Sequence, residues 1–174
     1  MEPSHSKGTG MERRTDEEAR AKVMEIARKA RTAMMCTYNA NGVAHGRPMA
    51  AVEYEDDALW FFTRADSRKL DEIARDPRVT LTYSDQSAND WLSIQGRATV
   101  TRDKAKAKEL WVEPLRTWFP NGPEDDEVAL IRVEAESAEY WDSPSGLVVF
   151  AYGYVKAALT GEPPEPGDVA QVEM

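Results

Sequence analysis

The chain has 174 residues, of which 41% are hydrophobic and 30% are charged, a composition typical of one globular domain with a substantial core. Its formal net charge of −9 argues against nucleic acids and anionic membrane surfaces as partners, because both are bound by basic faces. The single cysteine, Cys36, excludes an intrachain disulfide, and neither a secretory signal nor a membrane span is recognisable, so we expect a cytoplasmic protein.

The first half of the chain predicts a polar tail, one helix and three strands. Residues 1–14 are polar and aperiodic, which is typical of a disordered tail. Thr15 and Glu18 match a capping box, and the apolar spacing after them predicts a helix to about residue 30. Pro48 cannot donate to a strand ladder and indicates an edge or a bulge. The predicted strands are separated by tight turns and cover residues 32–38, about 43–55, and 58–63.

The second half predicts shorter helices between further strands. A helix should begin at Ser67 and end near Arg75, because Pro77 disfavours helix in the residue before it. Gly96 indicates a bulge or a close backbone approach, and Asp103 should cap a helix over residues 104–111. The remaining predictions are strands at 78–84, 91–101 and 128–142, a loop-rich stretch at 113–127, and an apolar helix at 146–161.

The order of these elements predicts the fold class. Consecutive strands joined by tight turns pair antiparallel, whereas βαβ crossovers would need longer connections. We therefore expect an α+β, mainly β, protein: an antiparallel split β-barrel with flanking helices. The domain should cover residues 15–165, with residues 166–174 as a partly extended C-terminal tail.

Most common catalytic motifs are missing from the sequence. His5 and His45 have no second imidazole at ligand spacing, and no P-loop or G-x-G-x-x-G motif is present. The triplet Ser67-Arg68-Lys69 is more informative, since it places two cations at the positive end of a predicted helix. Such a triplet is either a solvated face or an anion-binding site, and Arg47 on an earlier strand could converge on it.

The spacing of several short motifs resembles a known family. The segment "GRPMAAV", the pair "FT" and the triplet "SRK" resemble the flavin-binding core of the pyridoxamine 5′-phosphate oxidase-like split barrels. The later segments "QGRATV", "LW", "WFPNGP" and "AEYWD" resemble the general stress protein branch of that superfamily. The resemblance covers about residues 15–165.

The resemblance implies that the chain binds FMN as a homodimer. Arg47 and the strand through Val52 would lie along the ring and ribityl chain, Ser67-Arg68-Lys69 would bind the 5′-phosphate, and Trp141 would approach from the second subunit. Phe62 and Met49 have the alternative of filling the barrel, and the tryptophans that of packing at the interface. The implied cofactor-binding set is Arg47, Pro48, Met49, Val52, Phe62, Thr63, Ser67, Arg68, Lys69, Trp91 and Trp141.

The implied function is that of an FMN-dependent oxidoreductase acting with a small-molecule redox partner. The oxidases of the family carry an Arg-x-His near the C-terminus, whereas this chain reads "SPSGLVVFAYGY" after Asp142, which argues against vitamin B6 oxidation. The loop containing Asp125-Asp126 also departs from the stress-protein pattern. The alternatives are a non-enzymatic flavin binder, a deazaflavin or haem in the same barrel, and a purely structural dimerisation domain that binds no FMN. No residue is predicted to be catalytic.

Overall fold

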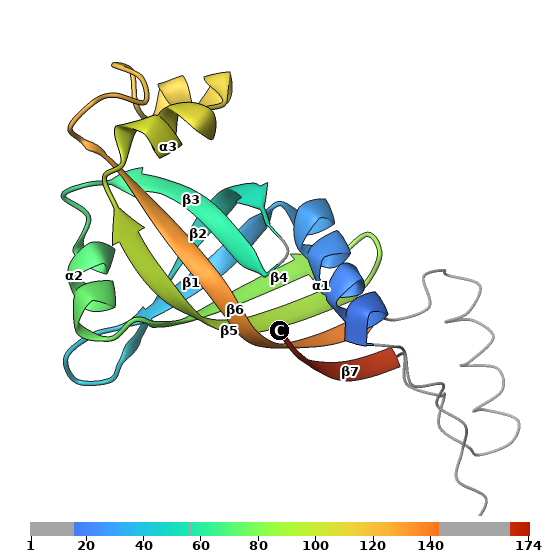
Figure 1. The fold of residues 1–174 in the computed structure, drawn as a ribbon. Coiled ribbons are helices and arrows are strands. Elements are labelled where there is room, and N and C mark those ends of the chain that lie inside the picture. The colour runs from blue at the N-terminus through green and yellow to red at the C-terminus, as the bar shows by residue number, and fades with distance from the viewer. Residues whose placement is uncertain (1–15, 56, 143–167) are drawn as a thin grey trace, which may run out of the picture.

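A computed structural model of the chain describes residues 16–55, 57–142 and 168–174 (Figure 1). The elements in chain order are α1 (Asp16–Ala30), β1 (Thr32–Tyr38), β2 (Ala44–Tyr54), β3 (Ala58–Arg64), α2 (Arg68–Arg75), β4 (Arg78–Asp85), β5 (Asp90–Thr101), α3 (Lys104–Glu109), the short 3-10 helix η1 (Glu113–Thr117), β6 (Val128–Asp142) and β7 (Asp168–Glu173). The predicted capping residue Thr15 and the predicted helix at 146–161 lie outside the described residues.

The strands form an antiparallel barrel. They are ordered β3-β2-β1-β4-β5-β6-β7, and an additional pairing of β3 with β6 closes β1 to β6 into a ring. The strand β7 pairs with the second half of β6, beyond the part of β6 that pairs with β3. The predicted mainly β barrel with flanking helices is therefore confirmed, and residues 168–173 of the predicted tail form a strand of its sheet.

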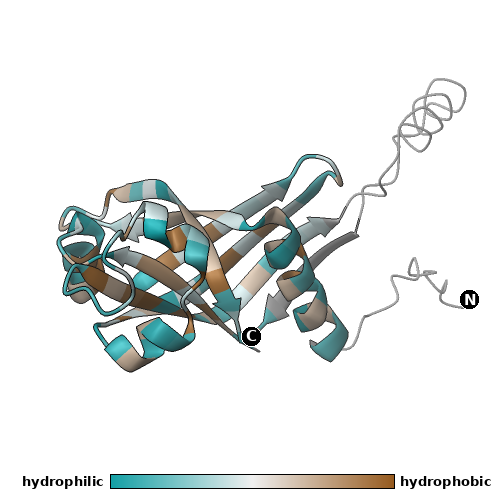
Figure 2. Ribbon diagram, turned by 90° about the horizontal axis from the view of Figure 1, so that it is seen from above, coloured by the Kyte–Doolittle hydropathy of each residue, from teal (hydrophilic) through white to brown (hydrophobic). Residues whose placement is uncertain are grey.

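The core lies inside the barrel and beneath α1. Side chains on β1 alternate between exposed and buried, as expected where one face of a strand meets a core. The helix α1 buries Val23, Ile26 and Ala27 completely. Figure 2 shows the consequence, with hydrophobic residues on the strands and mainly hydrophilic ones on the helices. No helix in the described part of the chain is long and apolar enough to cross a membrane.

The barrel has an opening between β2 and β3. Strand β2 pairs with β1 from Ala44 to Ala50, but it pairs with β3 only from Ala51 onward, with a register shift before Glu53. Residues 44–50 thus have no described strand on their other side, which confirms the edge predicted from Pro48. The helix α2 follows β3 directly and packs against β1 near this opening (Figure 1).

Local predictions in the second half of the chain are mostly confirmed. The ladder between β5 and β6 shifts register next to Gly96, where a Cβ atom would collide with the carbonyl oxygen of Glu134. Asp103 caps α3 by accepting bonds from the amides of Ala105 and Lys106. The helix ends earlier than expected, at Glu109, and the loop-rich stretch after it contains η1.

Candidate functional site

A group of polar side chains lies at the opening between β2 and β3, with Lys69 of α2 at its centre. Its Nζ donates to the hydroxyls of Thr63, at 2.8 Å, and Ser67, at 2.9 Å. Ser67 is the N-cap residue of α2, but its side chain makes no capping bond to the first turn of that helix. Within the described ranges, Lys69 forms no ion pair with an acidic side chain. The ammonium group is therefore half-buried with neutral partners.

The surroundings of Lys69 disfavour its positive charge. Burial lowers the pKa of Lys69 below its usual value, and the nearby guanidinium of Arg47 lowers this pKa further, while Glu72 raises it. A bound anion would remove part of this penalty, because it would screen the repulsion between the two cations. The electrostatics of this position thus favour an anionic ligand.

Two arginines complete the positive side of the cluster. Arg47 on β2 donates to Thr37 Oγ1 at 2.5 Å and to Glu72 Oε2 at 3.1 Å. The Nε of Arg68 lies 3.6 Å from Glu72 Oε1, and the Arg68 side chain is 76% exposed. Arg47 and Arg68 thus pair with the carboxylate of Glu72, and Lys69 lies close to both Arg47 and Glu72, in a chain whose net charge is −9. The cluster keeps an excess of positive charge.

Glu72 and Thr37 belong to this cluster although the sequence analysis did not select them. Glu72 is only 2% exposed, and its burial is offset by bonds from Thr37, His45 and Arg47 that lower its pKa to about 2. The sequence pattern around both residues could have placed them in this cluster. Glu72 follows Arg68 by four residues, the spacing of a helical ion pair, and Thr37 occupies an inward position in the alternation of β1.

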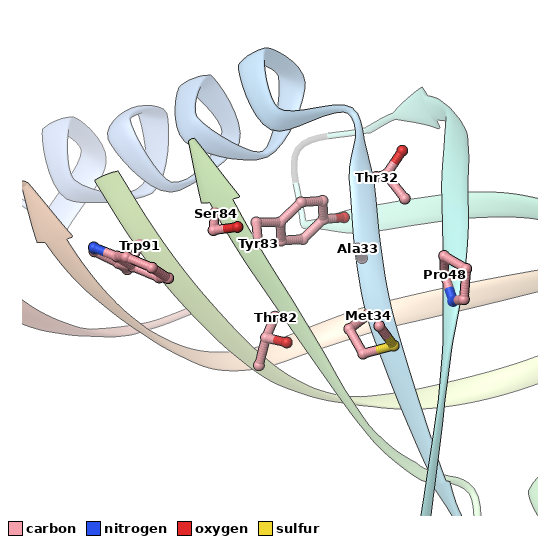
Figure 3. Close-up of a pocket in the computed structure, with 8 residues that line it drawn as sticks. All are labelled: Thr32, Ala33, Met34, Pro48, Thr82, Tyr83, Ser84 and Trp91. Atoms are coloured by element: carbon pink, nitrogen blue, oxygen red, sulfur yellow. The ribbon is translucent and has the colours of Figure 1, made fainter. Parts of the chain in front are cut away.

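A hollow of about 260 Å³ lies on the outer face of the sheet, across β1, β2, β4 and β5 (Figure 3). Pro48 and Trp91, both predicted site residues, contribute to its wall. Trp91 is 46% exposed and lies opposite Trp141, which is 38% exposed, in the register of β5 and β6. Among the described residues, the lining carries no charged side chain and consists of Thr32, Ala33, Met34, Pro48, Thr82, Tyr83, Ser84 and Trp91.

The other predicted residues lie in packed surroundings. Phe62 is buried, with its ring centroid 5.7 Å from that of Trp111 and 6.0 Å from that of Phe119. Val52 packs on the same apolar cluster, and Met49 packs against the main core. The structure therefore brings Arg47, Thr63, Ser67, Arg68 and Lys69 together. It places Pro48 and Trp91 on the outer face, and Phe62 and Val52 in a cluster of their own.

The described part of the chain offers no cluster of metal ligands. Over residues 16–55, 57–142 and 168–174, no three His, Cys, Asp or Glu side chains are grouped so that they could hold a metal ion. The chemistry available at the opening is thus that of hydroxyl and cationic donors, which suit an anion such as a phosphate ester.

Comparisons with known proteins identify the family of the chain. The family described as "Pyridoxamine 5′-phosphate oxidase like" matches residues 18–165, so the chain belongs to this family. A curated relative, Protein bli-3 of Neurospora crassa, is 28% identical over 123 residues, which cover 66% of this chain and 59% of the fungal protein. The chain therefore spans less than two thirds of that relative.

Solved structures with the same fold include several general stress proteins. A general stress FMN/FAD binding protein from Xanthomonas citri is 28% identical, with a TM-score of 0.66 over 75% of this chain and 93% of that one. A candidate general stress protein 26 from Jannaschia sp. CCS1 is 22% identical, with a TM-score of 0.73 over 90% of this chain and 99% of that one. The latter likeness supports the split-barrel fold alone.

Proposed function

We propose that the chain is a general stress protein that binds FMN at the opening between β2 and β3. The observation that carries this proposal is the half-buried Lys69, which has two hydroxyl partners and lies near Arg47. Lys69, Ser67 and Thr63 would hold the 5′-phosphate, and the exposed Arg68 would turn toward it. The family match and the stated FMN/FAD binding of the Xanthomonas citri protein support the choice of a flavin.

The rest of the cofactor would lie along β2. The backbone of residues 44–50 has no described strand on one side and offers hydrogen-bonding groups to a flat polar ring. Pro48 and Trp91 would provide an apolar wall through the outer hollow. The packing of Phe62 against Trp111 and Phe119 supports the backbone of Thr63 from the opposite side. The donors and the wall together fit a flavin mononucleotide.

The proposed chemistry is oxidation and reduction of a small substrate. A bound flavin supplies the capacity to accept and deliver a hydride. The chain itself would bind the phosphate, orient the ring and exclude water from its face. No side chain is assigned as a general acid or base, so the protein's part is positioning and electrostatics.

A second copy of the chain would complete the site. In the part of the chain that the structure describes, no charged residue lines the hollow, and Met34, Trp91 and Trp141 are large apolar side chains that are 45%, 46% and 38% exposed. Exposed apolar patches with aromatic residues are typical of subunit interfaces. We place the flavin at the interface of a homodimer, with Trp141 reaching it from the partner, and we place the dimer in the cytoplasm.

Titration of the apoprotein with FMN and with riboflavin tests this function. FMN should bind far more tightly, because riboflavin lacks the phosphate. Removing two charge-assisted contacts in Arg68→Ala/Lys69→Ala should weaken FMN binding by about a hundredfold. Equal affinity for the two flavins in the wild-type protein would contradict the phosphate site. Oxidation of NAD(P)H above the rate with free FMN would support an enzyme, and its absence would favour a non-enzymatic flavin binder.

A further inference from the structure

Arg47, Arg68 and Lys69 surround the buried carboxylate of Glu72, which is not itself a proposed phosphate ligand. Glu72 Oε2 accepts from the Thr37 hydroxyl at 2.5 Å and from Arg47 at 3.1 Å, and Glu72 Oε1 lies 2.6 Å from His45 Nδ1. Thr37 Oγ1 also accepts from Arg47, so these two residues hold the guanidinium at two points. Since Glu72 is 2% exposed, these contacts are shielded from water.

These contacts connect α2 with both sides of the opening. Glu72 joins α2 to Thr37 on β1 and to Arg47 on β2. Three residues earlier on the same helix, Lys69 joins α2 to Thr63 on β3. The spacing between the Arg47 guanidinium and the Lys69 ammonium is therefore set through Glu72.

We propose that Glu72 is a positioning residue for phosphate binding, which holds Arg47 at a fixed spacing from Lys69 so that the anion meets a preformed site. This inference rests on the proposed function, because it assumes that a phosphate ester binds at Lys69. A long arginine side chain without this anchor would have to be ordered on binding, and that ordering reduces affinity.

Simple charge repulsion predicts the opposite effect. A carboxylate next to an anion site repels the anion, so its removal alone should tighten phosphate binding. Asp71 provides a matched control, since it lies on the same helix, is exposed and carries the same charge. Glu72→Gln and Asp71→Asn each remove one negative charge from α2, but only the first alters the contacts of Arg47, together with the ion pair to Arg68.

The test compares these two variants for FMN and riboflavin affinity. We expect Glu72→Gln to weaken FMN binding by about tenfold or more, and to weaken riboflavin binding clearly less. Asp71→Asn should leave FMN affinity within about threefold of the wild type, in the direction of tighter binding. Tighter FMN binding by Glu72→Gln, or equal effects of the two variants, would overturn the proposal.

Two further measurements keep the test decisive. Thr37→Val removes the hydroxyl that joins Arg47 to Glu72 without changing any charge, so it replaces Glu72→Gln if that variant does not fold. It should also weaken FMN more than riboflavin, and equal losses would count against positioning. The side-chain Nε–H signal of Arg47, assigned with Arg47→Lys, reports its order in NMR spectra without any flavin.

The NMR signal separates this inference from the proposed function. An Arg47 signal that is equally ordered in wild type and Glu72→Gln overturns the positioning role, whatever binds to the protein. A wild-type protein that does not prefer FMN to riboflavin overturns the proposed function instead.

Discussion

Two neighbouring residues of β3 lie in opposite environments. Phe62 is buried in an apolar cluster with Trp111 and Phe119, beneath α3 and η1. Thr63, the next residue, accepts a hydrogen bond from Lys69 in the polar cluster beside α2. Because successive side chains of a strand point to opposite faces, one strand can serve both clusters. The comparison indicates that the apolar cluster stabilises the fold, whereas the polar cluster is the proposed ligand site.

The largest expected effect is on the apolar side. Phe62→Ala removes a buried ring and leaves a cavity, which should lower the free energy of unfolding by about 3–5 kcal/mol. Urea unfolding measures this loss. The ratio of FMN to riboflavin affinity should stay near the wild-type value, because the phosphate contacts are untouched. An unchanged stability with a large loss of flavin affinity would mean that Phe62 acts mainly on the cofactor.

The second-largest effect is expected from acidification, which should destabilise the polar cluster around Glu72. The pKa of Glu72 is lowered from 4.5 to about 2, so this residue stabilises the fold above pH 4.5 and the gain is lost as the pH falls toward 2. The loss should be on the order of 3 kcal/mol. Unfolding free energies of wild type and Glu72→Gln, compared between about pH 6 and pH 3, should converge in acid. Parallel pH profiles would contradict this assignment.

Removal of the Lys69 charge should affect binding rather than folding. Lys69→Met keeps the apolar stem and should weaken FMN binding by about 1.5–3 kcal/mol, with little change in riboflavin affinity. Lys104→Met makes the same change on α3, where Lys104 is 54% exposed, and is the matched control. Isothermal titration of both variants with FMN checks the difference. Equal losses in the two variants would point to net charge rather than to a site.

The smallest effect is expected at the cap of α3. Asp103 accepts bonds from two amides of the first turn, so Asp103→Ala should cost about 1 kcal/mol of stability. The helix contributes Ala107 to the cluster around Phe62, and the cost should therefore appear in thermal unfolding and not in FMN affinity. A selective loss of FMN binding in this variant would show that the apolar cluster also affects the proposed ligand site, which would contradict the separation of the two clusters.

The elements of the fold were predictable because their signals are local. The strand β1, the cap at Asp103 and the end of α2 before Pro77 each depend on a few adjacent residues. The cations Arg68 and Lys69 were also recognisable, since two positive charges at a helix start are unusual. The length of α3 and the presence of η1 could not be predicted from local sequence, because they depend on the tertiary packing of Leu110 and Leu115.

The amino-acid sequence alone determined the antiparallel strands, their flanking helices and the triplet Ser67-Arg68-Lys69, because each follows from neighbouring residues. Only the tertiary structure decided that Glu72 is buried against Thr37 and Arg47, and that Phe62 packs away from Thr63's hydrogen-bonding partners. The reason is physical: burial of a charge depends on donors from β1 and β2, which closure of the barrel brings to α2 from distant parts of the chain.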